Sequence, residues 1–308
     1  RRLLRITAIA AIVLALLVAL LAWLAQPPRA TAFLLGRIGT SLGLEIRAGA
    51  SDYRLRGTPQ LVLHDVVAQR RGDAAPLLRA ERIFVALPWS TLRAGGDDLT
   101  VQRIELDAPV LDVPALQRWQ ATRPPSETRI PTLRDGLRVV RGRIVNDDWT
   151  IEGIDVALPS LAPGKPVKAQ LEGRYLDPPT TIPFELAVAM SKPANDAGIA
   201  TVGSLSIEGT GWRLPARLQL SGPLHLGNDE VRMAPATFGI AARYVSATSE
   251  LPFTLGAFGP LHFDEGVWAL DPATLVLRGH GPPSKTLVPQ AQARGAAALG
   301  RRLVLRLE

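Results

Sequence analysis

Apolar and polar residues alternate with a period of two along most of this chain after residue 44. In a β-strand successive side chains point to opposite faces, so a run of this kind predicts a strand that buries one face. Turn-forming sequences such as Asn146-Asp147-Asp148 and Asp177-Pro178-Pro179 separate the runs. The pattern predicts a mostly β chain. The clearest alternating positions are Leu61 and Leu63; Ile83, Val85 and Leu87; Ile104 and Leu106; Ile182, Phe184, Leu186 and Val188; and Leu303, Leu305 and Leu307.

An internal repeat organises the later strands. GPLHLGNDEVRMAPATFGI at residues 222–240 and GPLHFDEGVWALDPATLVL at residues 259–277 align without a gap. A unit of this length is predicted to form a meander of two or three strands that cannot bury its apolar face alone. Stacking of successive units therefore predicts an elongated, curled antiparallel β-sheet.

The apolar face of such a sheet must be covered by a second layer or remain open as a groove. Few amphipathic helices are available in the sequence to cover it, so we predict an open groove. A row of ordinary core residues is the alternative reading of the same pattern. The candidate groove residues are Ile83, Val85, Leu87, Ile104, Leu106, Ile182, Phe184, Leu186, Val188, Phe238, Ile240, Leu275 and Leu277.

Two helical patterns precede the strands. The apolar segment from Ile6 to Ala25 is long enough, at about 1.5 Å per residue, to cross a hydrocarbon core of about 30 Å. Three cations precede this segment and one aromatic residue lies near its far end, namely Arg1, Arg2 and Arg5, and Trp23. The positive-inside rule then predicts a single-pass anchor in a bacterial inner membrane, with a cytoplasmic N-terminus and a periplasmic bulk.

The residues after the anchor leave an alternative open. Ala30-Thr31-Ala32 is an A-x-A pattern, so a cleavable secretory signal with a mature N-terminus near Phe33 is the competing interpretation. Further on, Leu34, Leu35, Ile38 and Leu42 recur near helical spacing before Gly43, which predicts a short amphipathic helix beside the membrane.

Composition limits the chemistry. The sequence has no Cys, which excludes disulfides and thiolate sites, and its net charge of +7 comes mostly from dispersed Arg residues, so no nucleic-acid partner is predicted. His64-Asp65 is interpreted as a polar pair at a strand end, and His225 and His262 as copies of one structural position in the repeat. No motif of a nucleophile, metal or nucleotide site is present. We therefore predict no enzyme, no metal and no cofactor.

Two segments carry a resemblance to a known family. GRIGTSLGLEIRAGASDYRLRGTPQLVLHDVVAQ, followed by LLRAERIFVALPWSTLRAGGDDLTVQRIELDAPVLDV, resembles the start of AsmA-family proteins. The shared features are the anchor helix, a short helix ending in Gly, an L-x-A-x-x-I-x-V-x-L-P strand and an I-x-L-x-x-P-x-L-x-V strand. The later half, as in LPFTLGAFGPLHFDEGVWALDPATLVLRG, is similar to the repeating strands of that family. The matching positions are Gly43, Leu61, Leu63, Leu78, Ala80, Ile83, Val85, Leu87, Leu92, Ile104, Leu106, Pro109, Leu111 and Val113.

The resemblance implies a β-groove protein of the bridge-like lipid-transfer superfamily. It implies an inner-membrane tether, phospholipid as the bound partner, and a role in lipid transport toward the outer membrane and in outer-membrane homeostasis. The alternative is a secretion or outer-membrane assembly accessory, similar to the N subunit of type II secretion, that binds an envelope protein partner. The expected organisation is an anchor at 1–28, a juxtamembrane helix at 29–43, an AsmA-like β region at 44–121 and a repetitive β-groove region at 122–308.

Overall fold

The computed structural model describes most of the chain after residue 34. The described residues are 35–36, 39–40, 43–73, 75–94, 98–122, 130–226, 231–264, 267–280, 290–299 and 303–307. The predicted anchor at residues 1–28 lies outside them, as does the predicted cleavage site. Within the described ranges, no helix is long and apolar enough to cross a membrane.

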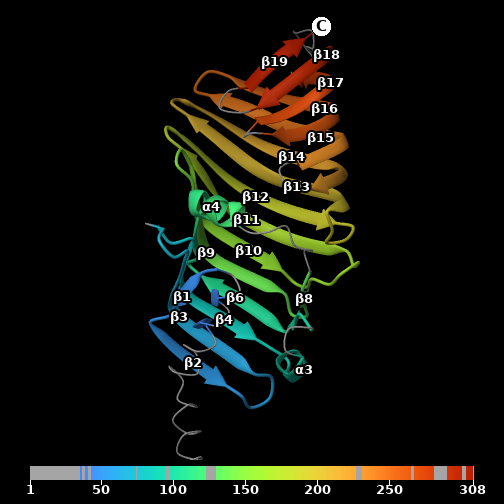
Figure 1. Cartoon of the computed structure of the whole chain (residues 1–308). Coiled ribbons are helices and arrows are strands. Elements are labelled where there is room, and N and C mark those ends of the chain that lie inside the picture. The colour runs from blue at the N-terminus through green and yellow to red at the C-terminus, as the bar shows by residue number, and fades with distance from the viewer. Residues whose placement is uncertain are drawn as a thin grey trace, which may run out of the picture.

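The prediction of a mostly β chain is confirmed: the described part of the chain is a long, curled, antiparallel sheet, and the two helices with assigned bounds in it, α3 and α4, are short (Figure 1). The elements are β1 (Glu45–Arg47), β2 (Ala50–Arg54), β3 (Gln60–Gln69), β4 (Leu78–Ala86), α3 (Trp89–Arg93), β5 (Thr100–Val101), β6 (Arg103–Asp107), β7 (Val110–Asp112), α4 (Val113–Ala121), β8 (Thr132–Leu133), β9 (Leu137–Val145), β10 (Thr150–Leu158), β11 (Val167–Asp177), β12 (Thr180–Met190), β13 (Asp196–Gly209), β14 (Trp212–Leu226), β15 (Val231–Ser246), β16 (Glu250–Asp264), β17 (Val267–Gly279), β18 (Gln290–Leu299) and β19 (Leu303–Leu307).

Strand order follows chain order over most of the sheet. Seventeen strands belong to one sheet, and from β9 to β19 each strand pairs antiparallel with the next. The sheet therefore grows by one strand per turn, and the chain passes from one end of the molecule to the other (Figure 1). Two residues on β5 and two on β8 form a separate parallel pair.

The N-terminal part is joined to this meander by a parallel junction that the alternating pattern did not predict. β6 and β7 pair antiparallel with β4 on one side and parallel with β9 on the other. The crossover between β7 and β9 contains α4, where the Asp112 side chain accepts a hydrogen bond from the N–H of Ala115 and so caps the helix. As a result, the predicted regions 44–121 and 122–308 share one continuous sheet.

Residues with a positive φ interrupt the strands of the N-terminal half. Asp65, Ala108, Arg141 and Gly153 have φ of 51°, 45°, 55° and 60°, and they lie on β3, between β6 and β7, on β9 and on β10. Near Arg141 and Gly153 the register of β10 shifts against β9 and against β11, as at a β-bulge, which bends a strand and increases its twist. Across Asp65 the register of β3 against β4 is unchanged.

The structure corrects the expectation that His64-Asp65 lies at a strand end. The pair lies inside β3 rather than at its end, and Asp65 has a positive φ of 51°. The His64 Nε2 atom is 4.0 Å from the Asp52 carboxylate on β2, and both side chains are largely exposed.

The two copies of the repeat occupy successive hairpins, β14–β15 and β16–β17. The strand register shifts at the same place in both, between Ser221 and Leu224 and between Phe258 and Leu261. Pro235 and Pro272 follow cis peptide bonds at matching positions. Proline has no N–H to donate, so a bulge is one of the few places in a sheet that accepts it. The repeated Pro-Ala-Thr sequence is therefore a repeated bulge.

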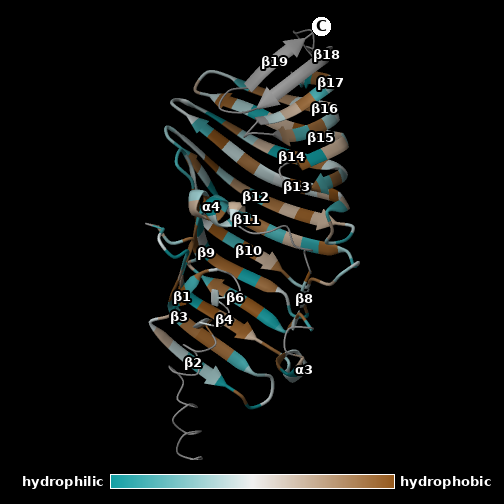
Figure 2. Ribbon diagram, viewed as in Figure 1, coloured by the Kyte–Doolittle hydropathy of each residue, from teal (hydrophilic) through white to brown (hydrophobic). Residues whose placement is uncertain are grey.

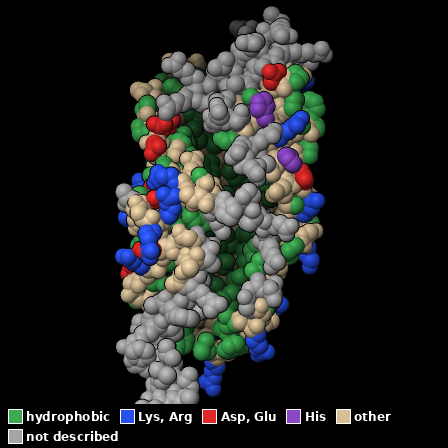
Figure 3. Space-filling view, in the orientation of Figure 1, with side chains coloured by type: hydrophobic (Ala, Val, Ile, Leu, Met, Phe, Trp, Pro, Cys, Tyr) green, Lys and Arg blue, Asp and Glu red, His purple; other side chains and the backbone are tan. Residues whose placement is uncertain are grey.

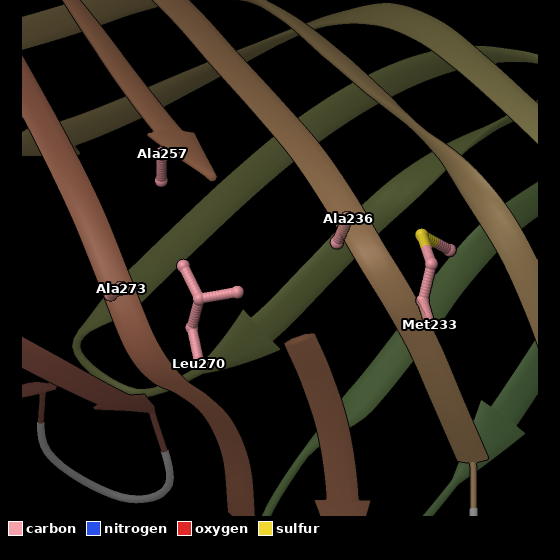
Figure 4. Close-up of a cluster of buried hydrophobic side chains, with 5 residues drawn as sticks. All are labelled: Met233, Ala236, Ala257, Leu270 and Ala273. Atoms are coloured by element: carbon pink, nitrogen blue, oxygen red, sulfur yellow. The ribbon is translucent and has the colours of Figure 1, made fainter. Parts of the chain in front are cut away.

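More than half of the buried hydrophobic residues in the described part of the chain are Ala, and two clusters of buried residues stand out. Leu35 packs against Leu63, Val66 and Ala80 at the N-terminal end. The second cluster lies on the bulges of the repeat (Figure 4) and consists of Met233, Ala236, Ala257, Leu270 and Ala273. Among the described residues no large side chain is fully buried. A second layer packed on the sheet would bury large side chains, so this pattern is typical of a single layer.

The predicted juxtamembrane helix is described only in part. Residues 35–36 and 39–40 are helical, and Gly43 has a φ of 65°, the left-handed conformation that commonly ends a helix. The N–H of Leu44 donates to the carbonyl of Gly39 at 2.8 Å. Gly43 therefore ends the helix, as its place in the sequence predicted.

Candidate functional site

One face of the sheet carries an uninterrupted apolar row from β3 to β17. Cross-strand partners share a face, so the strand registers identify the residues that lie side by side. We call this set the central row. In chain order it is Leu63, Ile83, Leu106, Val139, Val156, Leu171, Leu186, Gly203, Leu218, Ile240, Leu255 and Leu277. Every member is aliphatic except Gly203.

The sequence-predicted groove residues nearly all belong to this face, which we call the inner face. Ile83, Leu106, Leu186, Ile240 and Leu277 are members of the central row. Others lie two or four residues away on the same strands and therefore share the face: Val85, Ile104, Ile182, Phe184, Val188, Phe238 and Leu275. Leu87 directly follows the end of β4 at Ala86, and its N–H donates to the carbonyl of Pro59, which continues the pairing with β3 by one residue.

The inner face is hollowed and its side chains are accessible. Brown and teal positions alternate along the strands in Figure 2, and Figure 3 shows hydrophobic side chains lining a long depression between two margins. Most members of the central row are half-buried, and Leu277 is 41% exposed. All described strands except β5 and β8 belong to this one sheet, so no second sheet covers the hollow in the described part of the chain. The geometry is that of a groove.

Aromatic pairs mark the long margin formed by the turns β9–β10, β11–β12, β13–β14 and β15–β16, which we call margin A. Trp149 lies 5.9 Å from Tyr175 between ring centroids, and Trp212 lies 6.0 Å from Tyr244. Burial raises the pKa of Tyr175 above its ordinary value, and the charge of Asp177 and its hydrogen bond with the hydroxyl act in the same direction. The phenol therefore stays protonated at neutral pH.

The opposite face, which we call the outer face, carries the charges. Arg174 contacts Glu152 at 2.8 Å and Arg243 contacts Glu250 at 2.9 Å. An open depression of about 1050 Å³ is lined by charged residues of this face, such as Glu172, Arg174, Glu185 and Arg217, and also by apolar residues, among them Phe184, Pro215 and Val245. Its mixed charges distinguish it from the apolar inner face.

An ion-pair network also lies on the outer face at β4 and β6. Arg82 contacts Asp107 at 2.9 Å and Glu105 at 3.1 Å. The hydrogen bond that Arg82 donates to Asp107 is the main reason that the pKa of Arg82 is raised, and the one that it donates to Glu105 adds to it. Arg82 is the direct cross-strand partner of His64 on β3. The network therefore ties β4 to β6 beside Asp65.

The histidines of the repeat lie on the outer face. His225 and His262 are both cross-strand partners of Arg232, and His225 Nδ1 is 2.5 Å from the Asp196 carboxylate. Among the residues that the structure describes, no three His, Asp or Glu side chains are placed to hold a metal ion. Their matched positions are explained by the repeat.

Sequence reasoning did not find the bulges or the aromatic margin. The bulge on β10 had a signal, because apolar residues are separated by two residues instead of one at Ile151-x-x-Ile154. The same spacing occurs at Leu63-x-x-Val66 and Ala80-x-x-Ile83, where the strand register is unbroken. The aromatic pairs had none, because Trp149 and Tyr175 come from different hairpins.

No protein-family model matches this chain, and neither a curated protein nor a solved structure was found to be similar to it. The resemblance to the AsmA family therefore remains a prediction from the sequence.

Proposed function

We propose that this protein binds phospholipid by its acyl chains along the inner face and lets the lipid move along the groove. The observation that carries the proposal is the central row, which is aliphatic from β3 to β17 apart from Gly203 and is not covered by a second sheet in the described part of the chain. A large apolar surface left open in this way is typical of a site for a ligand or partner.

The length of the row suits more than one lipid. Neighbouring strands are about 4.8 Å apart, so the strands from β3 to β17 extend the row over roughly 50 Å. One leaflet of a bilayer contributes only about half of the roughly 30 Å hydrocarbon core. A single acyl chain would therefore cover only part of the groove, which suits a track better than a closed pocket.

The energetics favour binding without a deep pocket. Removing a methylene group from water contributes about 0.8 kcal/mol, so even a half-covered acyl chain gains several kcal/mol. Neighbouring positions on the row are chemically alike, so sliding by one strand exchanges equivalent contacts. Movement along the groove then needs no catalytic residue, and the proposed activity is not enzymatic.

The cellular setting rests on the sequence alone. The apolar segment at residues 6–25 and the AsmA-like pattern support a tether in a bacterial inner membrane with the sheet in the periplasm. In that setting the protein would support inner-to-outer membrane lipid transport and outer-membrane homeostasis.

A second candidate function is an envelope assembly or secretion accessory of the type II secretion N kind. It is favoured by two exposed apolar side chains on the outer face, Val202 at 55% and Phe258 at 51%. A protein partner would cover them.

Lipid analysis tests the first proposal. The protein is extracted in a mild detergent and examined by native mass spectrometry and by lipid extraction. We expect phospholipid in molar amounts with the folded protein. Folded protein that repeatedly carries no phospholipid, together with a stoichiometric protein partner crosslinked at Val202 or Phe258, would favour the accessory function instead.

A further inference from the structure

One station on margin A combines two aromatic rings with a carboxylate. Trp149 directly precedes β10, and Tyr175 and Asp177 lie at the end of β11. Thr150 pairs with Leu176, so Trp149 and Asp177 flank neighbouring strand ends. Tyr175 is the cross-strand partner of Ile151 and Ile182, which places its ring on the inner face. We call Trp149, Tyr175 and Asp177 the margin station.

The two rings contact each other, and the carboxylate lies at the neighbouring strand end. The ring centroids are 5.9 Å apart, with the ring planes inclined at 34°. Thr150 pairs with Leu176, so the positions of Trp149 and Asp177 face each other across β10 and β11. A negative charge therefore lies at the strand end that carries the two rings.

The surroundings of the margin station are acidic. The turn before β10 contains Asp147 and Asp148, and no Lys or Arg occurs from 146 to 150 or from 176 to 182. The nearby cation Arg174 lies on the outer face and contacts Glu152 at 2.8 Å. The station therefore presents negative charge and aromatic faces at the boundary between the apolar groove and water.

The second aromatic pair on the same margin offers a natural comparison. Trp212 and Tyr244 have centroids 6.0 Å apart and planes inclined at 27°. The acidic residue that begins the next strand, Glu250, is held by Arg243 at 2.9 Å. This pair has the aromatic rings, but the carboxylate near it is ion-paired with an arginine.

We propose that the margin station binds the ammonium group of a zwitterionic phospholipid headgroup while the acyl chains lie on the inner face. This inference rests on the proposed lipid-binding function. An ammonium group is attracted by the faces of Trp and Tyr and by a carboxylate. A headgroup sits where the apolar surface meets water, and this is where the margin station lies. A headgroup that carries only negative charge meets carboxylates there and is disfavoured.

The size of the effect follows from the exposure of the site. Cation–π contacts at partly exposed positions are modest, and the carboxylate is screened by water. We therefore expect a preference of about three- to tenfold for ethanolamine or choline headgroups over glycerol headgroups. The primary ammonium of ethanolamine and the quaternary ammonium of choline should both be preferred over glycerol, since the aromatic faces attract either cation.

Lipid exchange with mixed vesicles tests the proposal. The full chain is incubated with vesicles of equimolar phosphatidylethanolamine and phosphatidylglycerol, separated, and its bound lipids are quantified by mass spectrometry. A parallel series replaces phosphatidylethanolamine with phosphatidylcholine. The variants are Asp177→Asn, which removes only charge, and Trp149→Leu, which removes a ring but keeps an apolar side chain. Trp212→Leu on the same margin is the matched control.

The expected results distinguish a failure of the margin station from a failure of the proposed lipid-binding function. The wild type and Trp212→Leu should be enriched in the zwitterionic lipid, whereas Asp177→Asn and Trp149→Leu should bind the same total lipid in the vesicle ratio. Wild-type protein that carries both lipids in the vesicle ratio would overturn the margin station alone. Folded wild type that takes up neither lipid would overturn the lipid-binding function as well.

Discussion

A charge placed in the central row should block lipid binding without unfolding the protein. Leu218 lies in the middle of β14, between its cross-strand partners Gly203 and Ile240 on the inner face. Its sequence neighbour Gln219 points to the outer face and is exposed. Leu218→Glu and Gln219→Glu therefore introduce the same charge one residue apart on opposite faces, which makes the second a matched control for the first.

The magnitude follows from the exposure of the site. A carboxylate at the centre of a hydrocarbon layer costs about 2.5 to 3.5 kcal/mol. Leu218 is only half-buried, so a bound acyl chain would cover one side of the new carboxylate and water the other. Roughly half of the full cost, about 1.5 kcal/mol, corresponds to an affinity about tenfold lower. The lipid-free protein loses little, because water already reaches this position.

The assay measures bound lipid and folding on the same samples. Phospholipid per protein is determined by extraction and mass spectrometry, and transfer of a fluorescent phospholipid between vesicles gives the rate. Leu218→Glu should lose about nine tenths of both signals at subsaturating lipid, while its thermal unfolding stays close to that of the wild type. Equal lipid content in Leu218→Glu and the wild type, or an equal loss in Gln219→Glu, would refute the assignment of the inner face as the lipid path.

Three further predictions concern stability and titration. Met233 is 4% exposed in the cluster of Figure 4, so Met233→Ala should lower the free energy of unfolding of the protein by about 2 to 3 kcal/mol. Val202→Ala on the exposed outer face should change it by less than about 0.5 kcal/mol. Urea denaturation measures both. Ala108 has a φ of 45°, so Ala108→Gly should relieve backbone strain and raise the free energy of unfolding by about 1 kcal/mol. A loss of stability in Ala108→Gly would contradict this strained conformation. The pKa of Tyr175 is raised in the folded protein, so Tyr175 should ionise above pH 10, the pKa of the unfolded chain. The stability that Tyr175 contributes is therefore present below pH 10 and is lost as the pH rises through the folded pKa. Absorbance titration of the wild type against Tyr175→Phe checks this.

Local pattern was enough to predict the class of fold and the residues of the inner face. Period-two alternation depends only on the geometry of an extended backbone, so it identified strands such as β4 and β12 and the shared face of Ile83 and Leu186. The repeat identified the stacked hairpins, because equivalent sequences form equivalent units. The end of the first helix at Gly43 was also predictable, since glycine readily adopts a positive φ.

The tertiary structure decided how these local faces join. The parallel pairing of β6 and β7 with β9 depends on contacts between distant residues, and without it the apolar rows of the two halves would not be continuous. The meeting of Trp149, Tyr175 and Asp177 depends on the register of neighbouring hairpins.

The sequence predicted an open inner face, but the alternating pattern alone did not distinguish it from a covered one. Alternation gives each side chain a face, but the bending of the sheet depends on strand pairing, which also fixes the register shifts such as those on β10, β15 and β17. The sequence by itself therefore determined which residues are apolar and share a face. The tertiary structure determined that those residues form one continuous groove, because only long-range hydrogen bonding fixes the order, register and bending of strands.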